Sequence, residues 1–195
     1  MKMLVVSDVE SGYIWDYFDP LPFRGVEVIL SCGDLSARYL DFLVSMIPAP
    51  LYYVPGNHDK NFLRHPPEGA ESVDCRLITC KGVRILGVGG CKSGRGSAFE
   101  YSEEAQRRRV RGLRGKIRRA GGFDILLTHV AARGLGDGED TFHQGFEVYR
   151  ELLERYEPRY HLFGHQHTCY QRRTGPAAYG NTQLVNACGY RILEY

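Results

Sequence analysis

The chain has 195 residues, of which 43% are hydrophobic and 25% charged, and its net charge is +2. This length suits one domain, residues 1–195, without a cap domain, and the composition excludes wholesale disorder. No apolar run approaches the ~20 residues that span a bilayer, and residues 1–8 lack the pattern of a signal peptide. We therefore expect no membrane association and a cytoplasmic location.

Short apolar strands alternate with amphipathic helices along most of the chain. In chain order we expect strands at 3–7 and 26–31, a helix at 37–47, a strand at 51–54, a hairpin at 76–89, a helix at 102–120, a strand at 124–128, a helix at 145–156 and a strand at 160–163. Residues 168–195 read as several antiparallel strands, with turns at 174–176 and 180–181. The pattern predicts a mixed α/β domain.

Side chains that commonly bind metals follow five of these strands. They are Asp8, Asp34, the run Asn57-His58-Asp59, His129, and the pair His165 and His167. Each could be a turn, a helix cap or a core histidine if it stood alone. Because sites in layered α/β folds form at the carboxyl ends of strands, five such clusters together indicate a shared site.

The predicted ligands are carboxylate, amide and imidazole groups, without a thiolate. Such donors suit Mn²⁺, Fe, Zn²⁺ or Mg²⁺. They are too many for one ion and sufficient for two, and two ions ~3.5–4 Å apart can clamp a phosphate for in-line displacement. The residues are therefore sufficient for a two-metal site that could bind a phosphate.

The motifs Asp8-x-Glu10, Gly33-Asp34, Gly56-Asn57-His58-Asp59, His129 and Gly164-His165-x-His167 resemble those of the calcineurin-like metallophosphoesterase superfamily, in order, over about residues 3–170. The resemblance implies a four-layer α-β-β-α sandwich with mixed sheets and a two-metal site at one edge. It also implies a phosphoric ester hydrolase that cleaves a phosphomonoester or phosphodiester by in-line attack of a metal-bridging hydroxide.

The resemblance also implies a role for each matched residue. Asp34 would bridge two divalent ions, Mn²⁺ foremost, with Fe, Zn²⁺, Mg²⁺ or Ni²⁺ as alternatives. Asp8 and His167 would bind the first ion, whereas Asn57, His129 and His165 would bind the second. His58 would be the general acid that protonates the leaving alkoxide, and Asp59 would orient His58 and keep it cationic.

One position departs from the family pattern. The first motif of the family is Asp-x-His, and Glu10 stands where the histidine would be. We expect Glu10 to bind a hard ion such as Mn²⁺ or Mg²⁺. The alternative is that Glu10 turns away, which would weaken the first metal site.

Two loops hold further candidates for contact with the substrate. In the glycine-rich loop at 134–145, His143 either contacts the substrate phosphate or faces solvent. In the basic loop at 91–96, Arg95 is a candidate cation for the same phosphate, and a solvated loop is the alternative.

The predicted helix at 102–120 carries eight Lys or Arg residues between positions 107 and 119. Val110, Leu113 and Ile117 share one helical face, so the helix should pack and turn its arginines outward. The stretch has no aromatic residues to stack on bases, so we favour a solvated face over a nucleic-acid site.

Alternative functions remain beside that of a small-substrate phosphoesterase. The first is a non-catalytic scaffold or protein-binding module of the same fold, and His58 argues against it because a scaffold needs no general acid. The second, less favoured, is a nuclease. The sequence identifies neither the substrate nor the oligomeric state.

Overall fold

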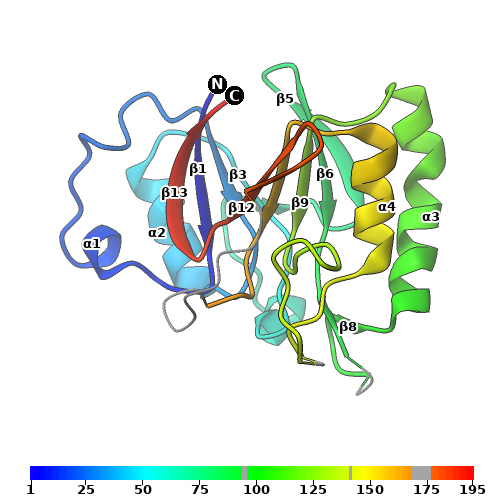
Figure 1. Cartoon of the computed structure of the whole chain (residues 1–195). Coiled ribbons are helices and arrows are strands. Elements are labelled where there is room, and N and C mark those ends of the chain that lie inside the picture. The colour runs from blue at the N-terminus through cyan, green and yellow to red at the C-terminus, as the bar shows by residue number, and fades with distance from the viewer. Residues whose placement is uncertain (94–95, 141, 168–176) are drawn as a thin grey trace.

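Two β-sheets lie face to face in the centre of the molecule, and helices cover the outer surface of each (Figure 1). The computed structural model describes residues 1–93, 96–140, 142–167 and 177–195. Helix α2 (Ala37–Met46) lies outside the first sheet, and α3 (Glu103–Arg119) and α4 (Glu147–Tyr156) lie outside the second. This order of layers is the predicted α-β-β-α sandwich with mixed sheets.

The first sheet has the strand order β13-β1-β2-β3-β4, and its four N-terminal strands run parallel to their neighbours. Its strands are β1 (Lys2–Ser7), β2 (Val28–Ser31), β3 (Leu51–Tyr53), β4 (Ala70–Ser72) and β13 (Gly189–Glu194). Strand β13 closes one edge by antiparallel pairing with β1, in a register that places Lys2 opposite Glu194. The N- and C-terminal residues therefore lie side by side.

The second sheet has the order β11-β12-β10-β9-β6-β5, with parallel strands in the middle and antiparallel pairs at both edges. Its strands are β5 (Arg76–Cys80), β6 (Val83–Val88), β9 (Ile125–Thr128), β10 (Tyr160–Phe163), β11 (Ala178–Tyr179) and β12 (Thr182–Asn186). The predicted hairpin is confirmed by the β5–β6 pair, which turns at Lys81 and Gly82. The predicted turn at 174–176 lies outside the described residues.

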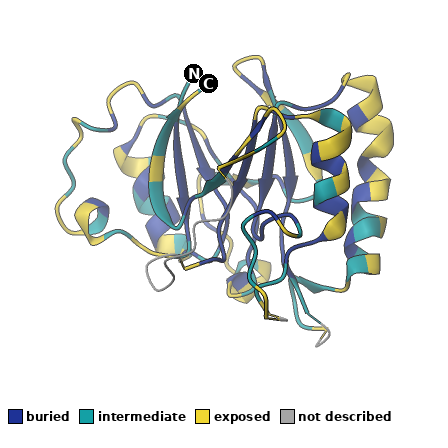
Figure 2. Cartoon of the chain, viewed as in Figure 1, coloured by how far each residue is buried: buried dark blue, intermediate teal, exposed yellow. Residues whose placement is uncertain are grey.

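Strands buried on both faces create three apolar layers, as the uninterrupted apolar runs require (Figure 2). Along β1, Val5 faces the space between the sheets, whereas Leu4 and Val6 face the layer of α2. Along β9, Leu127 joins Val5 between the sheets, and Leu126 faces α3 and α4. The core thus fixes both sheets and brings the ends of their parallel strands to one edge.

Short elements that the sequence did not predict lie around that edge and on the flank of the first sheet. They are α1 (Gly12–Trp15), the 3₁₀ helix η1 (Asp59–Leu63), the edge strand β4 (Ala70–Ser72), and the two-residue strands β7 (Cys91–Lys92) and β8 (Glu100–Tyr101). Their apolar segments are too short to show a period. The tail was expected to form antiparallel strands, and β11 and β13 pair in this way, but β12 pairs parallel with β10. The crossing of β13 to the first sheet was not expected.

Helix α3 is amphipathic, as predicted. The side chains of Val110, Leu113 and Ile117 are buried against the second sheet. Two arginines of the same helix are held by carboxylates, Arg107 by Glu151 at 2.6 Å and Arg109 by Asp74 at 2.5 Å. None of the helices in the described part of the chain is both long and apolar enough to cross a membrane.

A buried histidine on β10 has a structural role. His161 is fully buried, and its Nε2 lies 2.9 Å from Thr128 Oγ1, which itself donates to the Val130 carbonyl. His161 Nε2 therefore donates to Thr128, while its Nδ1 is buried without a partner among the described residues. Burial lowers the pKa of His161 to about 3.

We expect His161 to make the fold less stable in acid. Its pKa rises from about 3 when folded to 6.5 when exposed, so the unfolded chain binds more protons between these values. The free energy of unfolding should fall by up to ~1.4 kcal/mol for each pH unit below about 6.5, with no contribution above it. Urea unfolding at pH 7.5 and at pH 5 measures this decrease in unfolding free energy. The substitution His161→Phe should remove the part of the decrease that is due to His161. An identical loss in both proteins would contradict the assignment.

Candidate metal centre

The candidate ligands lie on loops that follow five parallel strands, β1, β2, β3, β9 and β10. Three of them adopt left-handed backbone conformations, with φ angles of 62° at Asp8, 57° at Asp34 and 64° at His165. Such φ values are uncommon for residues other than glycine, and they cluster where function demands a particular side-chain direction. Here they turn side chains inward at the point where each strand ends.

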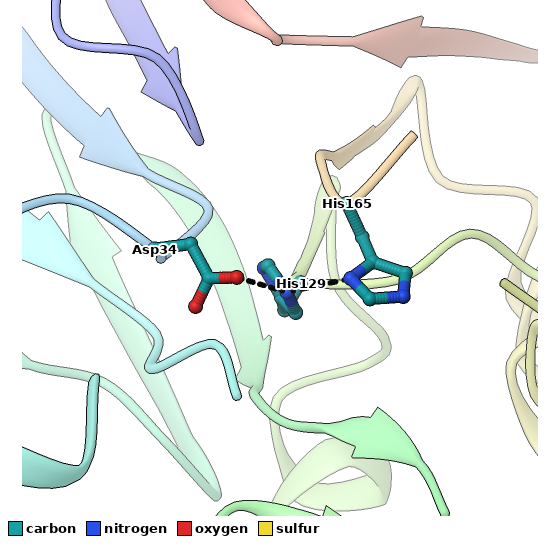
Figure 3. A group of neighbouring side chains, drawn as sticks. All are labelled: Asp34, His129 and His165. Atoms are coloured by element: carbon teal, nitrogen blue, oxygen red, sulfur yellow. Dashed lines mark hydrogen bonds and ion pairs between the residues drawn. The ribbon is translucent and has the colours of Figure 1, made fainter. Parts of the chain in front are cut away.

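Asp34, His129 and His165 form the centre of the site (Figure 3). Among the described residues, their donor atoms all lie within 4.8 Å of one another. His129 Nε2 lies 3.2 Å from Asp34 Oδ2 and 3.1 Å from His165 Nδ1. Asn57 adds its Oδ1 at 3.1 Å from the same nitrogen. The structure thus brings together four of the predicted ligands, from four different loops.

Backbone carbonyls orient both imidazoles toward this centre. A carbonyl only accepts hydrogen bonds, so His129 Nδ1 donates to Cys32 O at 2.8 Å and His165 Nε2 donates to Phe142 O at 2.9 Å. The remaining nitrogen of each neutral ring then presents a lone pair to the centre. Sequence reasoning did not find these two carbonyl partners, because any residue supplies a carbonyl.

The donor set fits a divalent cation. Ligand atoms bound ~2.1 Å from one ion lie about 3.0–3.4 Å apart, and the distances around His129 Nε2 fall in that range. Two imidazole nitrogens, a carboxylate oxygen and an amide oxygen suit Mn²⁺, Fe, Zn²⁺ and related ions. The carbonyl contacts match the outer-shell hydrogen bonds that orient metal-binding histidines.

The electrostatics of the cluster favour a positive charge at its centre. Burial lowers the pKa of an imidazole, but the Asp34 carboxylate overcomes this at His129 and raises its pKa to about 9. Burial likewise opposes ionisation of Asp34, yet His129 and the His58 backbone N–H bring its pKa to about 2. Burial, assisted by His129, lowers the pKa of His165 to about 4. A metal cation would supply the charge that a proton on His129 otherwise provides.

Two glycines are required by the close approach of these loops. A Cβ atom on Gly56 would collide with the Asp34 carboxylate, and one on Gly164 would collide with Ser7 and Asp8. Both positions adjoin candidate ligands, Asn57 and His165. Glycine is therefore required at these two motif positions for steric reasons, since any side chain there would displace a candidate ligand.

Asp8 and His167, the expected ligands of the first ion, lie beside the cluster. The Asp8 side chain is fully buried, and both of its oxygens accept from the His165 backbone N–H, at 3.0 and 2.8 Å. His167 Nε2 lies 3.8 Å from Asp8 Oδ1, and its side chain is 47% exposed. These two side chains approach each other but lie outside the group of donor atoms within 4.8 Å.

Asp59 does not hold His58 in the way we expected. Its buried carboxylate accepts from the backbone N–H groups of Gly56 at 2.8 Å and Asp34 at 2.9 Å, and so ties the β2 and β3 loops together. Burial raises the pKa of Asp59 to about 6. His58 itself is exposed, and its backbone N–H donates to Asp34 Oδ1 at 2.8 Å. Asp59 is therefore an organiser of the ligand loops.

Glu10 turns toward helix α2. It is exposed, and its Oε1 accepts from the backbone N–H of Ser36, the N-cap residue of that helix, at 3.1 Å. A carboxylate at a helix N-terminus is favourable because the first N–H groups lack partners within the helix. This placement corresponds to the alternative in which Glu10 turns away from the first ion.

From this placement, Glu10→Ala should leave the number of bound ions per chain unchanged. The variant should lose about 0.5–1.5 kcal/mol of unfolding free energy, the net value of one hydrogen bond. Elemental analysis after Mn²⁺ loading, with urea unfolding of the same preparations, measures both quantities. Loss of one ion per chain would instead show that Glu10 is a ligand.

The glycine-rich loop crosses the site, and His143 lies beside the cluster. The His143 and His165 ring centroids are 5.2 Å apart, and His143 Nδ1 lies 2.7 Å from Asp140 Oδ2. The sequence assigned no role to Asp140 or Gln166, which fasten this loop, although the three-residue spacing of Asp140 and His143 was a usable signal. In the basic loop, Lys92 pairs with Glu103 at 3.5 Å, and Arg95 lies outside the described residues.

Comparison with known proteins identifies the family. The model of the calcineurin-like phosphoesterase family matches residues 1–169. A UPF0046 protein of Caenorhabditis elegans, T07D4.2, is 35% identical over 69 residues, which cover 34% of this chain and only 16% of that protein. The crystal structure of TT1561 of Thermus thermophilus has a TM-score of 0.61 at 16% identity and covers 98% of this chain and 93% of that one. The GAP50 structure of Plasmodium has a TM-score of 0.50 at 13% identity, over 85% of this chain and 66% of that one. The two structures share the fold, and the family match shows that the chain belongs to the calcineurin-like phosphoesterases.

Proposed function

We propose that this protein is a metal-dependent phosphoesterase that hydrolyses a small phosphorylated substrate. The convergence of Asp34, Asn57, His129 and His165 on one point carries the proposal. Two imidazole nitrogens, a carboxylate oxygen and an amide oxygen meet there in a buried setting, and a cation bound between them would offset the cost of burying these polar groups. Membership of a family of phosphoester hydrolases supports the same reaction.

Two divalent ions would be held at this edge, with Asp34 between them. Asn57, His129 and His165 would hold one ion, and Asp8 and His167 the other. When bound, such ions polarise a phosphoryl group and activate water at neutral pH. Mn²⁺ is our first candidate because hard oxygen donors and imidazoles share the site.

His58 would act on the leaving group. It lies on the β3 loop next to Asn57 and is exposed, so a substrate can reach its ring. Its backbone N–H holds Asp34 Oδ1, which couples its position to that of the metal ligands. A protonated His58 would donate its proton to the departing alkoxide oxygen, a step that typically accelerates hydrolysis ~10²–10⁴-fold.

Hydrolysis of p-nitrophenyl phosphate and bis-(p-nitrophenyl) phosphate in the presence of Mn²⁺, Mg²⁺, Zn²⁺, Fe²⁺ or Ni²⁺ tests the proposal. We expect cleavage of at least one ester, abolished by EDTA and restored by the ion. Binding of the ions without cleavage of either ester would contradict the proposal and favour a non-catalytic scaffold. Cleavage of DNA alone would favour a nuclease.

A further inference from the structure

The glycine-rich loop is fastened to the segment that carries His165. His165 Nε2 donates to the carbonyl of Phe142 at 2.9 Å, and Gln166 Nε2 donates to the carbonyl of His143 at 2.7 Å. Asp137 secures the base of the loop by accepting from the N–H groups of Gly134 and Gly145, at 2.7 and 2.9 Å. These bonds hold Phe142 and His143 against the ligand cluster.

Asp140 fixes the ring of His143. His143 Nδ1 donates to the Asp140 carboxylate, with its two oxygens at 2.7 and 2.9 Å. The same carboxylate accepts from the backbone N–H groups of Phe142 and His143, at 3.0 and 3.1 Å. Asp140 thus sets both the turn and the side chain, and in the described part of the chain Nε2 of His143 has no hydrogen-bond partner.

The ring of His143 lies next to the imidazole of His165, which is one of the candidate metal ligands. The ring centroids of His143 and His165 are 5.2 Å apart, at an angle of 41°. His165 in turn presents Nδ1 to His129 Nε2 at 3.1 Å. The His143 side chain is 39% exposed, so a ligand in the site can reach it.

We propose that His143, positioned by Asp140, binds a terminal oxygen of the phosphoryl group, and that the substrate is a phosphomonoester. The proposal rests on the proposed function. A phosphomonoester has three terminal oxygens, whereas a phosphodiester has two. The two ions would bind two of the three terminal oxygens. His58, next to Asn57 in the sequence, would donate its proton to the oxygen of the leaving group. The third oxygen needs a further donor. Because Nδ1 of His143 already donates to Asp140, the ring would donate from Nε2 as an imidazolium, and a charge-assisted hydrogen bond of this kind to phosphate is strong.

The test compares Mn²⁺-loaded wild type with His143→Ala, Asp140→Asn and His65→Ala. His65 is an exposed histidine outside the candidate ligand set and provides the matched control. We expect His143→Ala to lower kcat/KM for p-nitrophenyl phosphate ~10–100-fold, the usual effect of losing a hydrogen bond to a charged group. The same substitution should change kcat/KM for bis-(p-nitrophenyl) phosphate only slightly. For p-nitrophenyl phosphate, kcat/KM of Asp140→Asn should lie between those of wild type and His143→Ala, and kcat/KM of His65→Ala should equal that of wild type.

A binding measurement makes the test independent of turnover. Calorimetric titration with inorganic phosphate should show ~10-fold weaker binding or worse in His143→Ala, with Mn²⁺ content unchanged. Equal losses on both esters, or unchanged phosphate affinity, would overturn the proposal, as would loss of Mn²⁺. If wild type cleaves neither ester but binds phosphate through His143, the proposed function fails and this contact stands. If wild type is active and His143→Ala matches it, the proposed function stands and this contact fails.

Discussion

Asp34→Asn is expected to lower kcat/KM by about 10³-fold or more and to reduce the Mn²⁺ content of the protein. The substitution keeps the shape of the side chain but removes the negative charge that faces His129 Nε2 at 3.2 Å. A 10³-fold loss of kcat/KM corresponds to the loss of about 4 kcal/mol of transition-state stabilisation, which the bound metal would supply. Kinetics on p-nitrophenyl phosphate and elemental analysis of the same preparation measure both effects.

Asp16→Asn provides the matched control, because Asp16 is exposed and lies near α1, outside the ligand set. It should retain wild-type activity and metal content. Circular dichroism of both variants separates loss of the site from loss of the fold. An Asp34→Asn variant with two ions per chain and a normal rate would refute the central role of Asp34.

His58→Ala is expected to slow hydrolysis of an alkyl phosphate ~10²–10⁴-fold while the bound metal stays constant. An alkoxide leaves only with a proton, and His58 is the proposed donor. The p-nitrophenolate ion is stable without protonation, so p-nitrophenyl phosphate should show a much smaller loss. Steady-state kinetics on both substrates, with elemental analysis, measure the difference.

The dependence on the leaving group distinguishes an acid from a structural residue. A variant that lost activity equally on both substrates would place His58 in substrate binding or in the support of Asp34, whose carboxylate accepts from the His58 backbone N–H. An unchanged rate on the alkyl phosphate would remove His58 from the reaction. His65→Ala again provides the histidine control.

The layers and the position of the site were predictable because they depend on local patterns. The uninterrupted apolar runs of β1 and β9 require strands covered on both faces, and the polar residues that follow them must meet at one edge. The convergence of Asp34, His129 and His165 bears out that expectation. The crossing of β13 to pair with β1 depends on long-range contacts that no local pattern encodes.

Two carboxylates of the site, those of Asp59 and Glu10, have hydrogen-bond partners that the sequence did not predict. Asp59 follows His58 directly in the sequence, yet its carboxylate serves the backbone of Gly56 and Asp34. Glu10 stands at a motif position, but the N-terminus of α2 provides a competing donor at Ser36. Hydrogen bonds from backbone N–H groups orient the carboxylates of Asp59 and Glu10. A sequence pattern does not show such bonds, because almost every residue has a backbone N–H.

A crystal structure of the Mn²⁺-loaded protein, with anomalous diffraction to locate manganese, tests the central claim most directly. The account predicts one anomalous peak bound by Asp34, Asn57, His129 and His165, and a second bound by Asp34, Asp8 and His167. Manganese absent from both positions, with the four side chains arranged as here around His129 Nε2, would contradict it.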